Sequence, residues 1–195
     1  MIRELSSWVA KWLEQEGAIS GKDNRLFSYA VYSLLFGLLP IFIVMLLGLA
    51  FGMLREGLLM IAPFILIRKF SGGYHLSSPK LCVAFSAVVL ALVMRLIKLI
   101  IREGYITPLT VLVSLSVICL CKFSPVENEM RKLSKTEIQC FRKVTRLLAL
   151  AALSAYFFFY YTKQYDLAVP IGVGILLPAL LQFPCVPRFK RSPRM

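Results

Sequence analysis

The sequence contains a single histidine, His75, which lies seven residues before Cys82 in a polar segment between two apolar stretches. An imidazole can act as the base for a thiol, and the thiolate is the nucleophilic form of cysteine. If residues 75–82 formed one continuous helix, the two Cα atoms would be about 10.5 Å apart, which is too far for a hydrogen bond between the side chains. The chain must therefore bend for the two residues to act together.

The residues between His75 and Cys82 can supply that bend. Ser78 suits the N-cap of a helix and Pro79 suits its first position, so we expect a helix to start there. Cys82 then lies in the first turn, where the helix dipole and nearby Lys80 favour the thiolate. His75 would fold back from the preceding loop onto the sulfur as its base.

The neighbouring residues suggest further roles. The double glycine permits a tight turn whose N–H groups could form an oxyanion hole, and Arg68 could hold an anionic part of a substrate. The residues expected to form the oxyanion hole or shape the site are Gly72, Gly73, Ser77 and Ser78. Taken singly, each also has a structural explanation: packing for a membrane cysteine, capping for a loop histidine, and a turn for two glycines. One histidine and one nearby cysteine are too few ligands for zinc, so we predict no metal and no cofactor.

Composition indicates an integral membrane protein. The 195 residues are 58% hydrophobic with a mean hydropathy of +0.75, whereas soluble domains are about 45–50% apolar. The net charge of +13 is then best explained by membrane orientation and by binding of anionic lipid headgroups, and we expect no nucleic-acid partner.

Hydrophobic periodicity predicts an all-α polytopic fold with about six transmembrane or re-entrant helices. We expect one integral membrane domain over residues 1–195, with an interfacial amphipathic helix at 1–16, transmembrane helices within 27–184 and a basic cytoplasmic tail at 185–195. The expected spans are 27–54, 57–70, 81–101, 106–122, 144–161 and 166–184. Ser134 and Glu137 fit a capping box, which predicts a helix start ahead of the fifth span.

The distribution of positive charge predicts the topology. If the N-terminus is inside, most of the 23 lysines and arginines lie in inner segments, and the outer segments contain only Arg55, Arg102 and Lys163. Because lysine and arginine are enriched in cytoplasmic loops, both termini are expected in the cytoplasm. His75 and Cys82 then also lie on the cytoplasmic side, where thiols stay reduced.

The second span is too short to cross a bilayer unaided. Its apolar part, between Glu56 and Arg68, corresponds to about 17 Å of helix, against a hydrocarbon core of about 30 Å. Either the preceding helix makes up part of the difference, or the loop that follows lies below the membrane surface. In the second case, the polar backbone of that loop must line a wet vestibule with protein walls.

Two segments of the sequence resemble one known family. The segment from Arg68 to Cys82 has the pattern Arg-x-x-x-Gly-Gly-x-His followed by cysteine, and it resembles the catalytic segment of the accessory gene regulator B (AgrB) membrane cysteine peptidases. The segment 123–134 resembles a second loop of that family that begins Pro-Val-Glu/Asp. Here Lys132 stands where proline is usual. The length, the amphipathic N-terminus and the hydropathy also match along nearly the whole chain.

The resemblance implies a multi-pass enzyme of the bacterial cell membrane that turns a short peptide precursor into a cyclic quorum-sensing signal. The precursor would be AgrD-like, with an amphipathic head and an acidic tail. His75 would activate Cys82 to form an acyl-enzyme, and an internal cysteine or serine of the precursor would close a thiolactone or lactone ring. The resemblance also points to a homodimer.

The same hypothesis assigns precursor-binding roles to basic residues of both segments. The residues expected to bind the acidic part of the precursor are Arg68, Lys69, Lys80, Arg131, Lys132 and Lys135. Glu127 or Asn128 is a candidate to orient the imidazole of His75. The alternative explanation for the basic loop is positive-inside charge and lipid contact.

Two other functions stay open on the sequence alone. A small transporter or peptide-export component would explain six spans and the positive charge, although the two halves of the chain show no clear self-similarity. A membrane scaffold without catalytic activity would explain the hydropathy but would leave His75 and Cys82 without a role.

Overall fold

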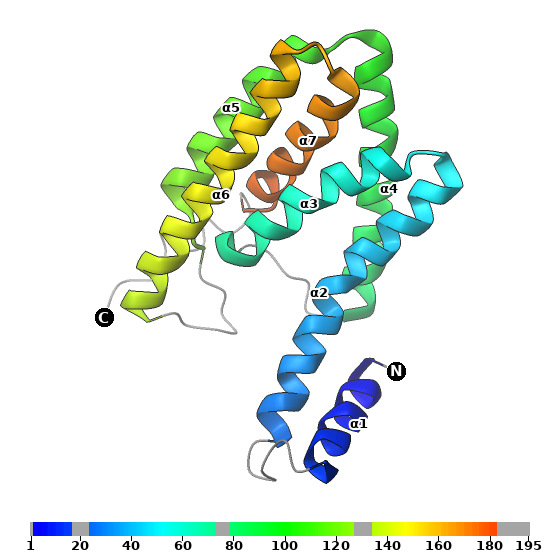
Figure 1. Cartoon of the computed structure of the whole chain (residues 1–195), viewed down its shortest axis with the longest axis vertical. Helices are drawn as coiled ribbons and strands as arrows, with labels where there is room; N and C mark the ends of the chain where they lie inside the picture. Colours follow the sequence, from blue (N-terminus) through cyan, green and yellow to red (C-terminus); the bar gives the residue numbers. More distant parts are fainter. Residues whose placement is uncertain (1, 17–23, 73–78, 127–133, 183–195) are drawn as a thin grey trace. The chain divides into compact units, whose positions relative to one another are not determined.

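The computed structural model describes residues 2–16, 24–72, 79–126 and 134–182 of the chain (Figure 1). Over these ranges the chain is all-helical, which confirms the predicted fold class. The helices are α1 (Ile2–Gln15), α2 (Asn24–Phe51), α3 (Leu54–Ser71), α4 (Pro79–Glu103), α5 (Ile106–Phe123), α6 (Lys135–Tyr161) and α7 (Tyr165–Gln182).

The contacts divide the chain into two compact units, Met1–Ile43 and Val44–Met195. In the first unit, the expected N-terminal helix is present as α1. Three of its large apolar side chains are exposed, and the indole of Trp8 is the most exposed of them at 65%. The exposed set is Leu5, Trp8 and Trp12. Exposed tryptophans on a short amphipathic helix are suited to the headgroup region of a membrane.

Four helices of the described residues are long and apolar enough to cross a membrane, namely α4, α5, α6 and α7. The apolar helical stretch Gly37–Phe51 within α2 is shorter. Helix α3 has 18 residues, about 27 Å of helix, but charged residues occupy both of its ends. The chain is therefore a polytopic membrane protein, while the count of about six spans stays a prediction.

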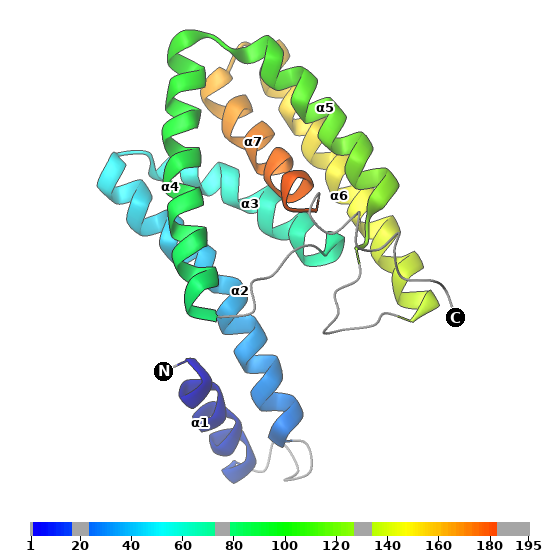
Figure 2. The ribbon, with the colours of Figure 1, turned by 180° about the vertical axis from the view of Figure 1, so that it is seen from behind.

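Helix α7 lies at the centre of the second unit. It packs most extensively against α3, then against α5 and α6, and less against α4 (Figures 1 and 2). Two glycines allow these close approaches. A Cβ on Gly172 would lie 2.7 Å from the ring of Tyr156, and a Cβ on Gly174 would lie 2.6 Å from Cγ of Pro63. Small residues at helix interfaces let helices approach closely where lipid offers no hydrophobic driving force.

The helix starts expected from the sequence are confirmed where the structure describes them. Helix α4 begins at Pro79, as its fixed φ favours. Helix α6 begins directly after Ser134, whose hydroxyl accepts from the backbone N–H of Glu137 while the Glu137 carboxylate accepts from the backbone N–H of Ser134. This reciprocal pair is the predicted capping box.

The described residues that flank both motif segments lie at the same end of the second unit. Helices α3, α5 and α7 end there, and helices α4 and α6 begin there (Figure 2). Their opposite ends are joined by short turns, one of which contains Gly104 with a φ of 74°. The alternation of helix direction therefore brings Ser71, Cys82, Ser124 and Gln182 to one end of the helices.

Candidate functional site

The structure describes some of the predicted site residues and not others. Arg68, Lys69, Gly72 and Cys82 are described, as is the helical backbone at Lys80 and Lys135. The predicted residues outside the described part of the chain are Gly73, His75, Ser77, Ser78, Glu127, Asn128, Arg131 and Lys132. The pairing of His75 with Cys82, and any role of the second loop in orienting the imidazole, therefore stay predictions.

Cys82 is the fourth residue of α4 and lies in its first turn, as the sequence predicts. Its side chain is half-buried, next to the exposed apolar side chains of Leu81 and Phe85. Cys82 is thus a free thiol, partly accessible, at the end of the helices that carries both motifs.

The last turn of α3 and the segment after α5 are joined by backbone contacts. The N–H of Val126 donates to the carbonyl of Ser71 at 2.9 Å, and Gly72 and Val126 form an isolated parallel β-bridge. Gly72 has a φ of 71°, a conformation that side chains with a Cβ disfavour. A Cβ at Gly72 would also collide with the backbone oxygen of Val126. This position therefore requires glycine for two independent reasons.

Arg68 also helps to hold this connection. Its Nη1 donates to the carbonyl of Gly72 at 2.9 Å, one turn further along the chain. Arg68 therefore stabilises the turn after α3 in addition to the predicted substrate role.

Sequence reasoning missed the side chain that joins these segments to α7. The Gln182 amide donates from Nε2 to the carbonyl of Ser71 at 2.9 Å and to the hydroxyl of Ser124 at 2.8 Å. All three residues are almost fully buried. The signal in the sequence was a single amide at the end of a largely apolar helix, since isolated polar residues in membrane segments are often functional. We call Ser71, Gly72, Ser124, Val126 and Gln182 the motif junction.

The start of α6 packs on the end of α3. The rings of Phe70 and Phe141 are 5.8 Å apart between centroids and nearly perpendicular at 72°, an edge-to-face arrangement that aromatic pairs prefer. Beside Phe141, the side chains of Arg142 and Lys143 are exposed. The basic start of α6 is therefore held next to the motif junction, where it can attract an acidic peptide or lipid headgroups.

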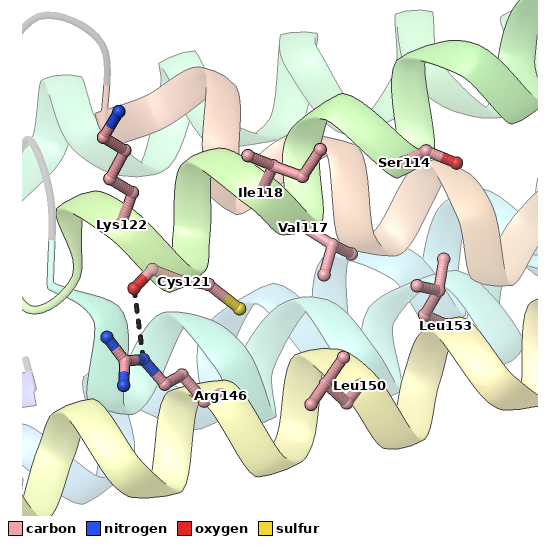
Figure 3. A pocket seen from close by; sticks show the side chains of 8 residues that line it. All are labelled: Ser114, Val117, Ile118, Cys121, Lys122, Arg146, Leu150 and Leu153. Atoms are coloured by element: carbon pink, nitrogen blue, oxygen red, sulfur yellow. Dashed lines mark hydrogen bonds between the residues drawn. The ribbon is translucent and has the colours of Figure 1, made fainter.

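A surface groove of about 580 Å³ runs between α5 and α6. Figure 3 shows that the Arg146 Nε donates to the carbonyl of Cys121, a contact of 3.2 Å that bridges the two helices. The lining residues are Ser114, Val117, Ile118, Cys121, Lys122, Arg146, Leu150 and Leu153. None of the predicted site residues that the structure describes lines the groove.

Comparisons with known proteins agree with the sequence resemblance. Residues 6–183 match the family described as accessory gene regulator B. The chain is 26% identical over 188 residues to AgrB-like protein 2 of Clostridium perfringens strain 13, with 90% of this chain and 86% of that protein covered. It is 23% identical over 193 residues to an AgrB-like protein of a second strain of that species, with 91% and 87% covered. No solved structure matches the chain.

Proposed function

Because this chain belongs to the accessory gene regulator B family, whose members take part in processing quorum-sensing peptides, we propose that it is a membrane cysteine endopeptidase that also cyclises its product. Its substrate is an AgrD-like precursor with an amphipathic head, an internal cysteine or serine and an acidic tail. The reaction takes place on the cytoplasmic side of the bacterial cell membrane. His75 and Cys82 carry the chemistry.

The first half of the reaction is acyl transfer to the enzyme. His75 takes the proton of the Cys82 thiol, and Sγ attacks the carbonyl carbon at the C-terminal end of the future signal. A carbon–sulfur bond forms as the peptide carbon–nitrogen bond breaks. The proton passes from the imidazolium to the leaving amine, which departs as the N-terminus of the acidic fragment.

The second half of the reaction closes the ring. The internal thiol or hydroxyl of the precursor attacks the thioester, its proton returns through His75 to the Cys82 sulfur, and the enzyme is regenerated. No water is consumed, because the energy of the broken peptide bond is retained as a thioester and then as the ring bond. Water near the acyl-enzyme would give a linear product instead, so a site shielded by protein favours cyclisation.

The observation that carries this proposal is the motif junction. The backbone N–H of Val126, which directly precedes Glu127, donates to the carbonyl of Ser71, four residues before His75. This contact joins two residues about 55 positions apart in the sequence. It lies at the end of the helices where α4, with Cys82 in its first turn, begins.

Basic residues near the junction support an acidic substrate. Lys69, Arg142 and Lys143 are exposed near the ends of α3 and α6, and long-range attraction to clustered positive charge raises the local concentration of an acidic peptide. The predicted ligands Arg131, Lys132 and Lys135 belong to the same basic stretch. Anionic lipid headgroups would compete with the precursor for these positive charges.

The test uses the purified full-length chain in liposomes with a synthetic precursor of the stated design. We expect wild type to release the acidic fragment and to form a ring product that is lighter than the linear peptide by one water, as measured by mass spectrometry. Cys82→Ala and His75→Ala should abolish both products. Cys140→Ala removes an exposed free thiol from α6 and serves as the matched control with wild-type activity.

Two results would contradict the proposal. Cleavage that continues in Cys82→Ala, with the variant normally folded and inserted, would exclude this thiol as the nucleophile. Uncut precursor that crosses the liposome membrane equally well with wild type and both variants would instead support the export function that the sequence leaves open.

A further inference from the structure

We infer that Gln182 is a positioning residue for the reaction of Cys82 with its base: from the end of α7 it joins Ser71, four residues before His75, to Ser124, three residues before Glu127. This inference rests on the proposed function and deepens it. Gln182 lies 111 residues after Ser71 and 58 residues after Ser124 in the sequence. It therefore connects the ends of three helices that are far apart in the sequence.

The orientation of the Gln182 amide follows from its partners. The carbonyl of Ser71 can only accept a hydrogen bond, so the NH₂ group must face it. The same nitrogen donates to Ser124, and both of its hydrogens are thereby used. The Ser71 carbonyl in turn accepts from Val126 and from Gln182. The carbonyl of the last residue of α3, which has no partner within the helix, is thus satisfied twice.

Burial makes this arrangement costly to disturb. Gln182 and Ser124 are each 2% exposed and Ser71 is fully buried, so water is not available to replace a lost donor. An unpaired buried polar group loses its hydration without compensation. Releasing the Ser71 carbonyl would therefore favour movement of Gly72, which lies three residues before His75, and of Val126, which directly precedes Glu127.

A change at Gln182 should act on the pairing of His75 and Cys82 without touching either residue. Gln182→Glu keeps the size of the side chain but places a carboxylate against the Ser71 carbonyl, so attraction becomes repulsion. Ser124→Ala is milder, since it removes one acceptor and leaves the bond to Ser71. Misplacement of reacting groups by about 1 Å can lower a rate by about a hundredfold.

The test measures the reactivity of Cys82 directly, so that it needs no precursor. The full-length chain in detergent micelles is alkylated with iodoacetamide across a range of pH, and modification of the Cys82 peptide is quantified by mass spectrometry. A thiol paired with an imidazole reacts at lower pH than a free one, because only the thiolate is nucleophilic. We expect Gln182→Glu to move the pH profile to that of His75→Ala, and Ser124→Ala to move it part of the way.

Matched controls separate positioning from general damage. Gln139→Glu makes the same change at an exposed site on α6. Ser116→Ala makes the same change as Ser124→Ala at a buried serine of α5 whose hydroxyl donates to the carbonyl of Leu112 in its own helix. Both controls should keep the wild-type profile. Helix content and melting of each variant, followed by circular dichroism, identify any variant that has lost the fold.

The outcomes distinguish the proposed function of His75 and Cys82 from the positioning role of Gln182. A wild-type profile in His75→Ala would overturn the proposed function and the positioning role with it. A shifted profile in His75→Ala but a wild-type profile in folded Gln182→Glu would overturn the positioning role alone. If Gln182→Glu does not fold, the milder Ser124→Ala decides: its profile must move further than that of Ser116→Ala for the inference to stand.

Discussion

Replacing Gly174 by alanine tests the packing that carries α3, and with it the motif junction, on the central helix α7. A Cβ at this position would collide with the backbone oxygen of Met60 and would lie 2.6 Å from Cγ of Pro63. Because carbon atoms prefer a separation of about 3.5–4.0 Å, the two helices must move apart by about 1 Å. Neither a backbone oxygen nor a proline ring can rotate out of the way.

The expected loss of stability can be estimated from these contacts. Forcing an extra methyl group into a well-packed interface costs about 1–3 kcal/mol. Because the neighbours here are rigid, we expect a cost at the upper end, about 3 kcal/mol. Alanine recovers up to about 1 kcal/mol, since glycine is the weaker helix former. The net loss is about 2 kcal/mol, roughly a thirtyfold change in the unfolding equilibrium.

Unfolding in mixed detergent micelles with increasing sodium dodecyl sulfate, followed by circular dichroism, measures this change. Gly37→Ala on α2 is the matched control, since no atom of the described residues lies within 4 Å of a Cβ there and only the helix-propensity gain should remain. Gly172→Ala should fall between the two, because its main obstacle is the side chain of Tyr156. A Gly174→Ala variant as stable as wild type would refute the close α3–α7 approach.

Three further changes test other parts of the structure. Gly72→Ala combines a φ of 71° with a collision at the Val126 backbone oxygen, so precursor cleavage in liposomes should fall by a factor between about 5 and about 150 for a strain of about 1–3 kcal/mol. Tyr156→Phe removes the 2.7 Å hydrogen bond to Thr110 between α6 and α5 and should lower stability in micelles by about 0.6 to 1.7 kcal/mol. Ser134→Ala removes half of the capping box of α6 and should speed amide hydrogen exchange in its first turn, for a loss of about 1 kcal/mol.

For each of these substitutions, one result would contradict the expected role of the residue. Normal cleavage by Gly72→Ala would show that the bridge to the second segment is dispensable. Equal stabilities of Tyr156→Phe and wild type would show that the hydrogen bond between α5 and α6 does not stabilise the fold. Ser154→Ala, at an exposed serine of α6 that bonds only to Leu150, is the control for Ser134→Ala, and equal exchange in both variants would contradict the capping role.

The sequence by itself determined the elements of this protein. Hydropathy and helical periodicity indicated a membrane protein made of helices, and local chemistry located two helix starts, at Pro79 and after Ser134, both of which the structure confirms. These features depend on residues within a few positions of one another. Proline geometry, a capping box and apolar runs are local, so sequence reasoning can recover them.

Only the tertiary structure decided which helix ends meet. Nothing in the local sequence pairs Gln182 with Ser71 or Ser124, and helix propensities do not predict that α7 becomes the central helix. Those contacts depend on the close approaches that Gly172 and Gly174 allow and on the need of buried polar groups for partners at long sequence separation. The sequence named the residues that could do chemistry, and the packing of α7 decides that Gln182 joins Ser71 at the end of α3 to Ser124 after α5.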